Sequence, residues 1–154
     1  MTFSCDEKLA GFAEMDFFLL EETANWPFVV TDENSAQIVF APSVNDVDAL
    51  LDPDSIDVSV KGKESSDGTL QQINISFKMI TRSEALDQLL EQYANKPGVV
   101  VGKLNNDFKK LYGTITEPLY LSFDVDDGSK AEGAAFTVIN IKGETRKRPV
   151  YYTP

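Results

Sequence analysis

The chain has 154 residues, of which 42% are hydrophobic and 25% charged, a size and composition typical of one globular domain. It contains no histidine and one cysteine, which excludes Ser-His and Cys-His catalytic pairs, thiolate metal cages and an internal disulfide framework. No run approaches about 20 consecutive apolar residues, and the first residues lack the basic start of a signal peptide. We therefore expect no membrane-spanning segment and synthesis in a reducing cytoplasm.

Charge is divided very unevenly along the chain. Residues 1–60 contain thirteen acids and one base (1 − 13 = −12), whereas residues 61–154 contain thirteen bases and twelve acids (13 − 12 = +1), which gives the total of −11. The N-terminal third should repel nucleic acid, whereas a second copy of the chain offers it a better-balanced surface. The charge pattern therefore predicts association between copies rather than tight binding to nucleic acid.

The elements expected before residue 55 are short. Residues 13–20 and 37–41 have the composition of strands, and residues 43–54 favour a short helical turn around 47–51. These are the least sharply defined elements of the chain.

A long β-hairpin is expected over residues 55–80. Apolar and polar residues alternate from Ile56 to Lys61 and again from Ile73 to Met79, which is the period of a half-buried strand. The polar segment 62–69 between them ends in a turn-forming Asp-Gly. It predicts a mobile tip that protrudes from the domain.

One helix is expected over residues 82–94. Thr81 and Glu84 have the spacing of a capping box, and apolar residues then recur on one face at helical spacing: Leu86, Leu89, Leu90 and Tyr93. Pro97 ends the helix because it restricts the residue before it. Further strands are predicted in four segments: 99–101, 109–116, 119–125 and 135–142. The last has apolar residues on both faces, which predicts either burial on two sides or a face closed by another chain.

Many short strands around a single helix predict a mainly β fold, an antiparallel sandwich or barrel that carries one packed helix. Nothing in the sequence divides the chain, so we expect one domain over 1–154. The two ends, about 1–12 and about 144–154, are predicted to form arms.

Possible catalytic and metal-binding residues are acidic. The densest acidic stretch, with Asp46, Asp48, Asp52, Asp54 and Asp57, could supply a carboxylate pair to a hydrolase, but a solvated loop explains it more simply. Asp124–Gly128 resembles a calcium loop without the EF-hand spacing, and an Asp-Gly turn accounts for it. We therefore expect no enzymatic activity, no metal and no cofactor.

Three other features could bind a ligand or partner. Cys5 lacks an activating base, and Trp26-Pro27-Phe28 either anchors a loop or stacks on a sugar ring. The basic C-terminal stretch, with Lys142, Arg146, Lys147 and Arg148 before Tyr151, could contact nucleic acid, but pairing with the acidic third of another copy uses both halves of the charge division. Arm contacts are therefore predicted at Arg146, Lys147, Arg148 and Tyr151.

A capped helix, several strands and the first residues of the chain form a recognisable order, in these segments: 81–94, 99–102, 111–114, 117–124, 133–143, 4–6 and 11–15. In these segments the chain resembles tail tube proteins of phages and prophages that infect Bacteroidetes. The segment 26–41 is short and acidic and departs from the family pattern.

The resemblance implies a β-sandwich with one flanking helix that assembles into a six-membered ring. Rings of such proteins stack into a virion tail tube, with an acidic passage through which DNA moves without tight binding. The hairpin tip and the terminal arms would link successive rings; here the tip contacts would be Lys61, Lys63, Glu64, Ser65, Ser66 and Asp67. Its partners would be further copies and other tail or neck proteins.

Two other kinds of protein remain open at this stage. A tail terminator, completion or baseplate protein, or the tube of an injection device, would share the family's features. A monomeric glycan- or peptide-binding module would instead use Trp26 and Phe28.

Overall fold

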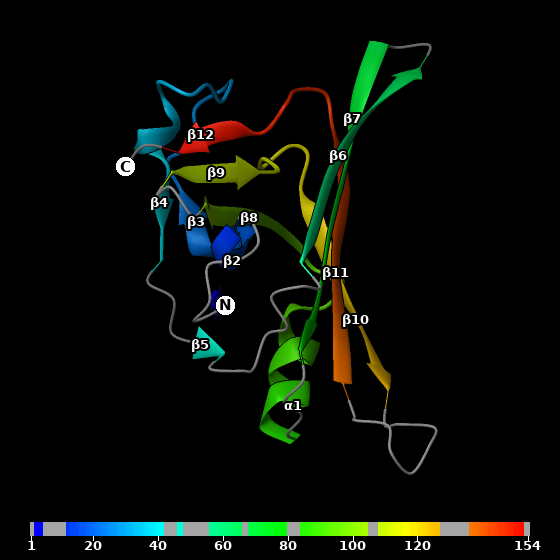
Figure 1. The fold of residues 1–154 in the computed structure, drawn as a ribbon. Coiled ribbons are helices and arrows are strands. Elements are labelled where there is room, and N and C mark those ends of the chain that lie inside the picture. Colours follow the sequence, from blue (N-terminus) through cyan, green and yellow to red (C-terminus); the bar gives the residue numbers. More distant parts are fainter. Residues whose placement is uncertain are drawn as a thin grey trace.

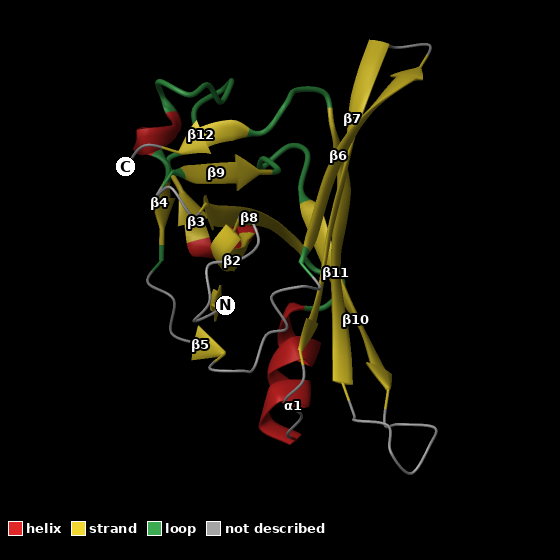
Figure 2. Ribbon diagram, viewed as in Figure 1, coloured by secondary structure: helices red, strands yellow, loops and turns green. Residues whose placement is uncertain are grey.

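The computed structural model describes residues 2–4, 12–41, 46–47, 56–65, 68–79, 84–104, 108–126 and 136–152. These residues form twelve strands and one α-helix, α1 (Glu84–Tyr93). The strands are β1 (Thr2–Ser4), β2 (Phe12–Leu19), β3 (Thr23–Ala24), β4 (Val39–Phe40), β5 (Asp46–Val47), β6 (Asp57–Ser65), β7 (Gly68–Met79), β8 (Pro97–Leu104), β9 (Lys109–Tyr112), β10 (Leu119–Asp126), β11 (Phe136–Thr145) and β12 (Val150–Tyr152). The predicted mainly β fold with one packed helix is confirmed for this part of the chain (Figure 2).

Ten of the strands belong to one curled sheet. Its order is β5-β1-β2-β8-β10-β11-β7-β6, with β9 beside β8 and β12 beside β9. Neighbouring strands are antiparallel except β1 and β5, which are parallel. In Figure 1, β10, β11, β7 and β6 run steeply and β8, β9 and β12 run across them. We call the first four strands the hairpin half, and β2, β8, β9 and β12 the β8 half.

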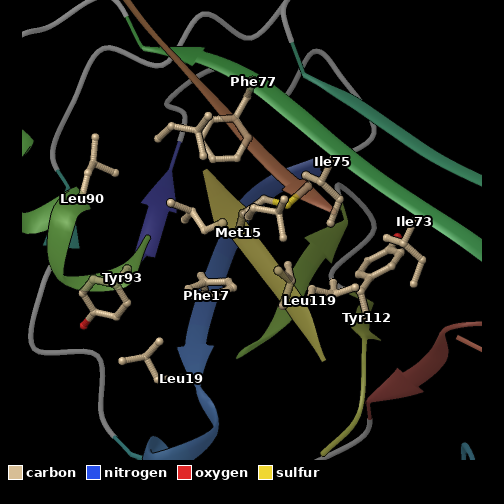
Figure 3. Close-up of a cluster of buried hydrophobic side chains, with 14 of the residues drawn as sticks. Met15, Phe17, Leu19, Ile73, Ile75, Phe77, Leu90, Tyr93, Tyr112 and Leu119 are labelled. Atoms are coloured by element: carbon tan, nitrogen blue, oxygen red, sulfur yellow. The ribbon is translucent and has the colours of Figure 1, made fainter. Parts of the chain in front are cut away.

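The main core lies between the two halves of the sheet and α1 (Figure 3). The hairpin half contributes alternate residues of β7, and α1 contributes Leu90 and Tyr93, because the apolar positions of strand and helix recur with periods of 2.0 and 3.6 residues. The Phe17 ring from β2 meets the Tyr93 ring edge to face, with centroids 6.2 Å apart. Leu89, Leu90 and Tyr93 of the predicted apolar face thus pack against the core, whereas Thr81 and the Leu86 side chain fall outside what the structure describes.

A second, smaller core covers the opposite face of the β8 half. Phe18, Ile38 and Leu111 are buried there under the segment that follows β2. Phe40 holds this segment in place, since its ring lies 4.8 Å from Phe18 and 5.3 Å from Tyr152 between centroids. The β8 half is therefore apolar on both faces.

Gly98 allows β8 to approach β2 closely. A Cβ built at Gly98 would lie 2.5 Å from the Phe17 ring and 2.5 Å from the Phe18 carbonyl oxygen, which real Cβ atoms essentially never do. Pro97 was expected only to end the helix; Gly98 directly after it also lets the first strand after the helix pass over the core.

Replacing Phe17 with alanine should lower the free energy of unfolding by about 3–5 kcal/mol, because the side chain is fully buried and its removal leaves a cavity. Phe28→Ala provides the matched control, since Phe28 is 105% exposed. Urea unfolding measures both. An equal effect of the two variants would contradict the described core.

The predicted hairpin is confirmed, but its two strands extend further toward the tip than expected. β6 and β7 pair continuously from Asp57↔Ser76 to Ser65↔Gly68, so most of the predicted loop 62–69 is strand. Polar residues suit such a ladder because its outer positions Glu64, Gly68 and Thr69 are exposed. The prediction of a loop there was wrong.

The structure also differs from two other expectations for the chain before residue 55. Asp46–Val47 is a strand that pairs with β1, whereas a helical turn was expected around 47–51; residues 48–55 lie outside the described residues. Within the predicted N-terminal arm, Thr2–Ser4 pairs with β2 of the same chain. Pairing partners this distant in sequence explain why local patterns did not identify these strands.

Candidate functional site

The hairpin tip projects beyond the rest of the sheet (Figure 1). The last pair between β7 and β11 is Gln71↔Thr145, so among the described residues the outer positions 63–65 and 68–70 pair only with each other. Lys61 and Glu64 are exposed on β6. Of the other predicted tip residues, Lys63 and Ser65 lie on this outer ladder, and Ser66 and Asp67 fall outside the described residues.

The hairpin half has two open edges. β6 is the last strand of the sheet and pairs only with β7 among the described residues. At the other side, β10 pairs with β8 at Leu119 and Tyr120 and bridges Ala94 at Leu121. From Ser122 to Asp126 that side of β10 has no partner strand among the residues described. Unpaired edges offer backbone N–H and C=O groups to another chain.

The face of the hairpin half that points away from the core is polar and electrically balanced. The register places residues of even number from β7, β10 and β11, and of odd number from β6, on this face, because side chains alternate across a strand. In the described part, the register places four acids and four bases on this face: Asp57, Asp124, Asp126, Glu144, Lys61, Lys63, Lys78 and Lys142. Gln72 donates a hydrogen bond to Glu144 at 3.2 Å. The acidic excess of the N-terminal third thus lies elsewhere.

The C-terminal residues are held against their own domain. β12 pairs with β9 through Val150↔Leu111, Tyr151↔Lys110 and Tyr152↔Lys109. The predicted arm from about 144 therefore begins as the end of β11 and returns to the body in this structure. Its reach to a neighbouring copy stays a prediction.

Asp32 fastens this C-terminal segment. Its carboxylate accepts a hydrogen bond from Arg148 Nη2 at 3.0 Å and one from the Tyr151 backbone N–H at 2.9 Å. Ser35 Oγ donates to the Tyr151 carbonyl oxygen at 3.0 Å. The Arg148 guanidinium first, and then the Tyr151 N–H, hold the pKa of Asp32 below its usual value, and Asp32 in turn raises the pKa of Arg148.

Arg148 was predicted to contact an acidic residue of another copy, and here it pairs with an acid of its own N-terminal third. Nothing in the sequence pointed to Asp32 and Ser35, because a single aspartate in a polar loop gives no sign of a partner more than 100 residues away. Arg146 and Lys147 remain exposed. Tyr151 lies in a small exposed aromatic group, with the Phe108 ring 6.3 Å and the Lys110 Nζ 5.1 Å from its ring centroid.

Replacing Asp32 with asparagine should loosen β12 without unfolding the domain. The amide keeps an acceptor for the Tyr151 N–H but loses the ion pair, so hydrogen-exchange protection at Tyr151 should fall several-fold at neutral pH. A carboxyl with a lowered folded pKa contributes stability above its ordinary value of 3.8, and that contribution is lost as pH falls through the lowered pKa.

Protection at Tyr151 should therefore fall with acidification in the natural protein and stay flat in Asp32→Asn. Glu33→Gln, at the next and exposed position, is the matched control. Equal protection at Tyr151 in all three proteins at neutral pH would contradict the role of Asp32.

The aromatic cluster divides into an anchor and an exposed ring. Trp26 donates from Nε1 to Thr23 Oγ1 at 2.8 Å and packs edge-on against Phe40 at 6.5 Å between centroids. Phe28 is fully exposed. Trp26 thus anchors the segment after β2.

The acidic stretch is only partly described, by Asp46 on β5 and Asp57 on β6; Asp48, Asp52 and Asp54, like Cys5, fall outside the described residues. In the described part of the chain, no group of three His, Cys, Asp or Glu side chains is placed to hold a metal ion. No helix among the described residues has the length and apolarity required to cross a membrane.

No protein-family model, curated protein or solved structure matches this chain. The two open edges and the projecting hairpin are the most distinctive surfaces of the described part of the chain.

Proposed function

We propose that this chain is a structural subunit of a phage tail or a related injection device, which assembles into closed rings that stack into a conduit for DNA. The observation that carries the proposal is the pair of open edges on opposite sides of the hairpin half. Edges of this kind, left free on a monomer, invite uncontrolled pairing, and closure into a ring removes them.

The two edges have the right directions to pair. β6 is antiparallel to β7, β7 to β11, and β11 to β10, so β6 and β10 run in opposite directions. Rotation about a ring axis brings β10 of one copy beside β6 of the next in an antiparallel arrangement. The ring sheet then continues the pairing pattern found within each copy.

The positions of the open edges along the strands also fit a barrel. Lys61, in the middle of β6, is in register with Gln72 of β7 and, through it, with Glu144 of β11. Asp124, in the middle of the open part of β10, is in register with Val138 of β11. The offset is 144 − 138 = 6 positions along β11. Six positions span about 20 Å and four strands about 19 Å, which gives a tilt of about 45°, close to that of closed barrels.

Placing the middles of the two open edges side by side, as in this barrel, sets Lys61 opposite Asp124 of the neighbouring copy. Both side chains are exposed and lie on the polar face. A cross-strand pair of opposite charge stabilises an antiparallel contact modestly and disfavours a shift in register. Charge would therefore help to align the edges, while the backbone hydrogen bonds supply the attachment.

In such a ring the polar face of the hairpin half lines the passage, because the main core covers its other face. A wall with four acids and four lysines at its described positions neither attracts nor repels DNA strongly. Net neutralisation of phosphates, which would hold the DNA in place, is small. The acidic passage expected from the family resemblance is thus replaced, in this proposal, by a balanced one.

Cysteines at the two edges test ring closure. In a Cys5→Ser background, Lys61→Cys with Asp124→Cys should give disulfide-linked oligomers that end at one closed size, six copies if the resemblance holds. Within one copy β7 and β11 separate the two positions, so no internal disulfide can form.

Three control variants accompany this experiment. Each single cysteine variant should stop at dimers, and Lys61→Cys with Gln72→Cys, a pair of facing residues within the hairpin, should link internally. A double variant that stays monomeric under oxidation at high protein concentration would rule the ring contact out.

A further inference from the structure

An apolar groove lies at the same end of the molecule as the hairpin tip. Its volume is about 180 Å³, and it lies between the segment after β2, the turn after β9 and the connection from β11 to β12. The three segments appear together at the top of Figure 1, on the side of β9 and β12. We call this site the apex groove.

The apex groove has an apolar wall and a basic rim. Phe28, Val29 and Ile115 line it, and all three are exposed, Phe28 at 105%. Arg146 and Lys147 lie on the rim and are exposed. The one acid of the lining, Glu117, uses its carboxylate to accept the Arg146 backbone N–H at 2.8 Å.

Such a cluster of exposed apolar side chains is unusual on a free surface and marks a contact site. A fully exposed phenylalanine makes no packing contact in the isolated domain, so the domain does not need it for its own stability. Its burial against a partner would stabilise a complex. The basic rim favours a partner that is both apolar and acidic.

The chain itself contains such a segment. Residues 46–54 read Asp-Val-Asp-Ala-Leu-Leu-Asp-Pro-Asp, with four acids, no base and two adjacent leucines. Its first two residues form β5, which lies with α1 at the opposite end of the molecule from the apex groove (Figure 1). Stacking copies in the same orientation brings these opposite ends together.

We propose that the apex groove receives the acidic segment 46–54 of a second copy, in the adjacent ring. An aliphatic side chain of Leu50 or Leu51 fills the groove beside Phe28, and the neighbouring aspartates face Lys147 and Arg146. This inference rests on the proposed stacking. The contact would join adjacent rings at their outer side.

Carbodiimide cross-linking of the assembled protein tests the contact, since the reagent joins an amine to a carboxylate without a spacer. A mixture of isotopically light and heavy copies distinguishes links between copies from links within one. We expect Lys147 of one copy to be joined to Asp48, Asp52 or Asp54 of another. Lys147→Arg should assemble normally and lose that link.

A second variant measures the apolar part. Phe28→Ser should raise the protein concentration needed for ring stacking about tenfold or more and leave ring formation unchanged. Val39→Ser, an exposed apolar residue outside the groove, is the control and should have no effect.

The groove contact would be overturned if rings stack but Lys147 is not linked to residues 46–54 of another copy. It would also be overturned if Phe28→Ser stacks as readily as the natural protein. Either result would leave the proposed function standing. A protein that forms no rings would overturn both.

Discussion

Deletion of residues 63–67 should leave a folded, ring-forming domain whose rings no longer stack into long tubes. These residues lie beyond the last pair between β7 and β11, Gln71↔Thr145, so their removal exposes no core residue. It keeps the open edge of β10 and residues 57–62 of the open edge of β6. Gly62 still faces Gln71, and the three residues 68–70 can close the shorter hairpin.

The deletion should therefore leave the midpoint of thermal unfolding almost unchanged and abolish long tubes in electron micrographs. A variant in which the same five positions carry Gly and Ser separates the length of the tip from its side chains. If the deleted protein still forms tubes of normal length, the tip does not link the rings.

A proline at one of two adjacent positions in β6 should block ring closure while the monomer stays folded. In an antiparallel pair, successive residues direct their N–H groups to opposite edges, so of Ser59 and Val60 one faces β7 and the other faces the open edge. Proline removes the N–H and cannot donate to a partner strand.

The variant that faces β7 should lose about 3 kcal/mol or more of stability, because it breaks a hydrogen bond within the hairpin. The variant that faces the open edge should change stability by about 1 kcal/mol or less and remain monomeric. Urea unfolding and sedimentation velocity measure the two properties separately. If the proline variant that faces the open edge and the one that faces β7 both form rings as well as the natural protein does, β6 is not the ring contact.

The hairpin and the helix could be predicted because their patterns are local. Alternation from Ile73 to Met79 requires no knowledge of a partner strand, and the spacing of Leu89, Leu90 and Tyr93 identifies a helix face by itself. The mainly β fold class followed from these two elements and the short strands around them.

Elements that depend on distant partners could not be predicted. β12 has three residues, and its position depends on β9 and on Asp32, which lies 119 positions before Tyr151. The strand β5 is similarly short and exists by pairing with β1. No local composition distinguishes such segments from loops.

The candidate assembly surface could not be identified without the register of the sheet. The sequence showed that acids concentrate before residue 60, but not which charges share a face. Only the pairing of Lys142 with Tyr120 and of Glu144 with Gln72 revealed that the polar face of the hairpin half is balanced. The same register gave the offset between the two open edges.

Negative-stain electron microscopy of the purified protein over a series of protein and salt concentrations tests self-assembly most directly. The account predicts closed rings that persist at high salt, because backbone hydrogen bonds hold them, and stacks that shorten as salt screens the contacts between rings. Single particles of one copy at every protein and salt concentration would contradict it.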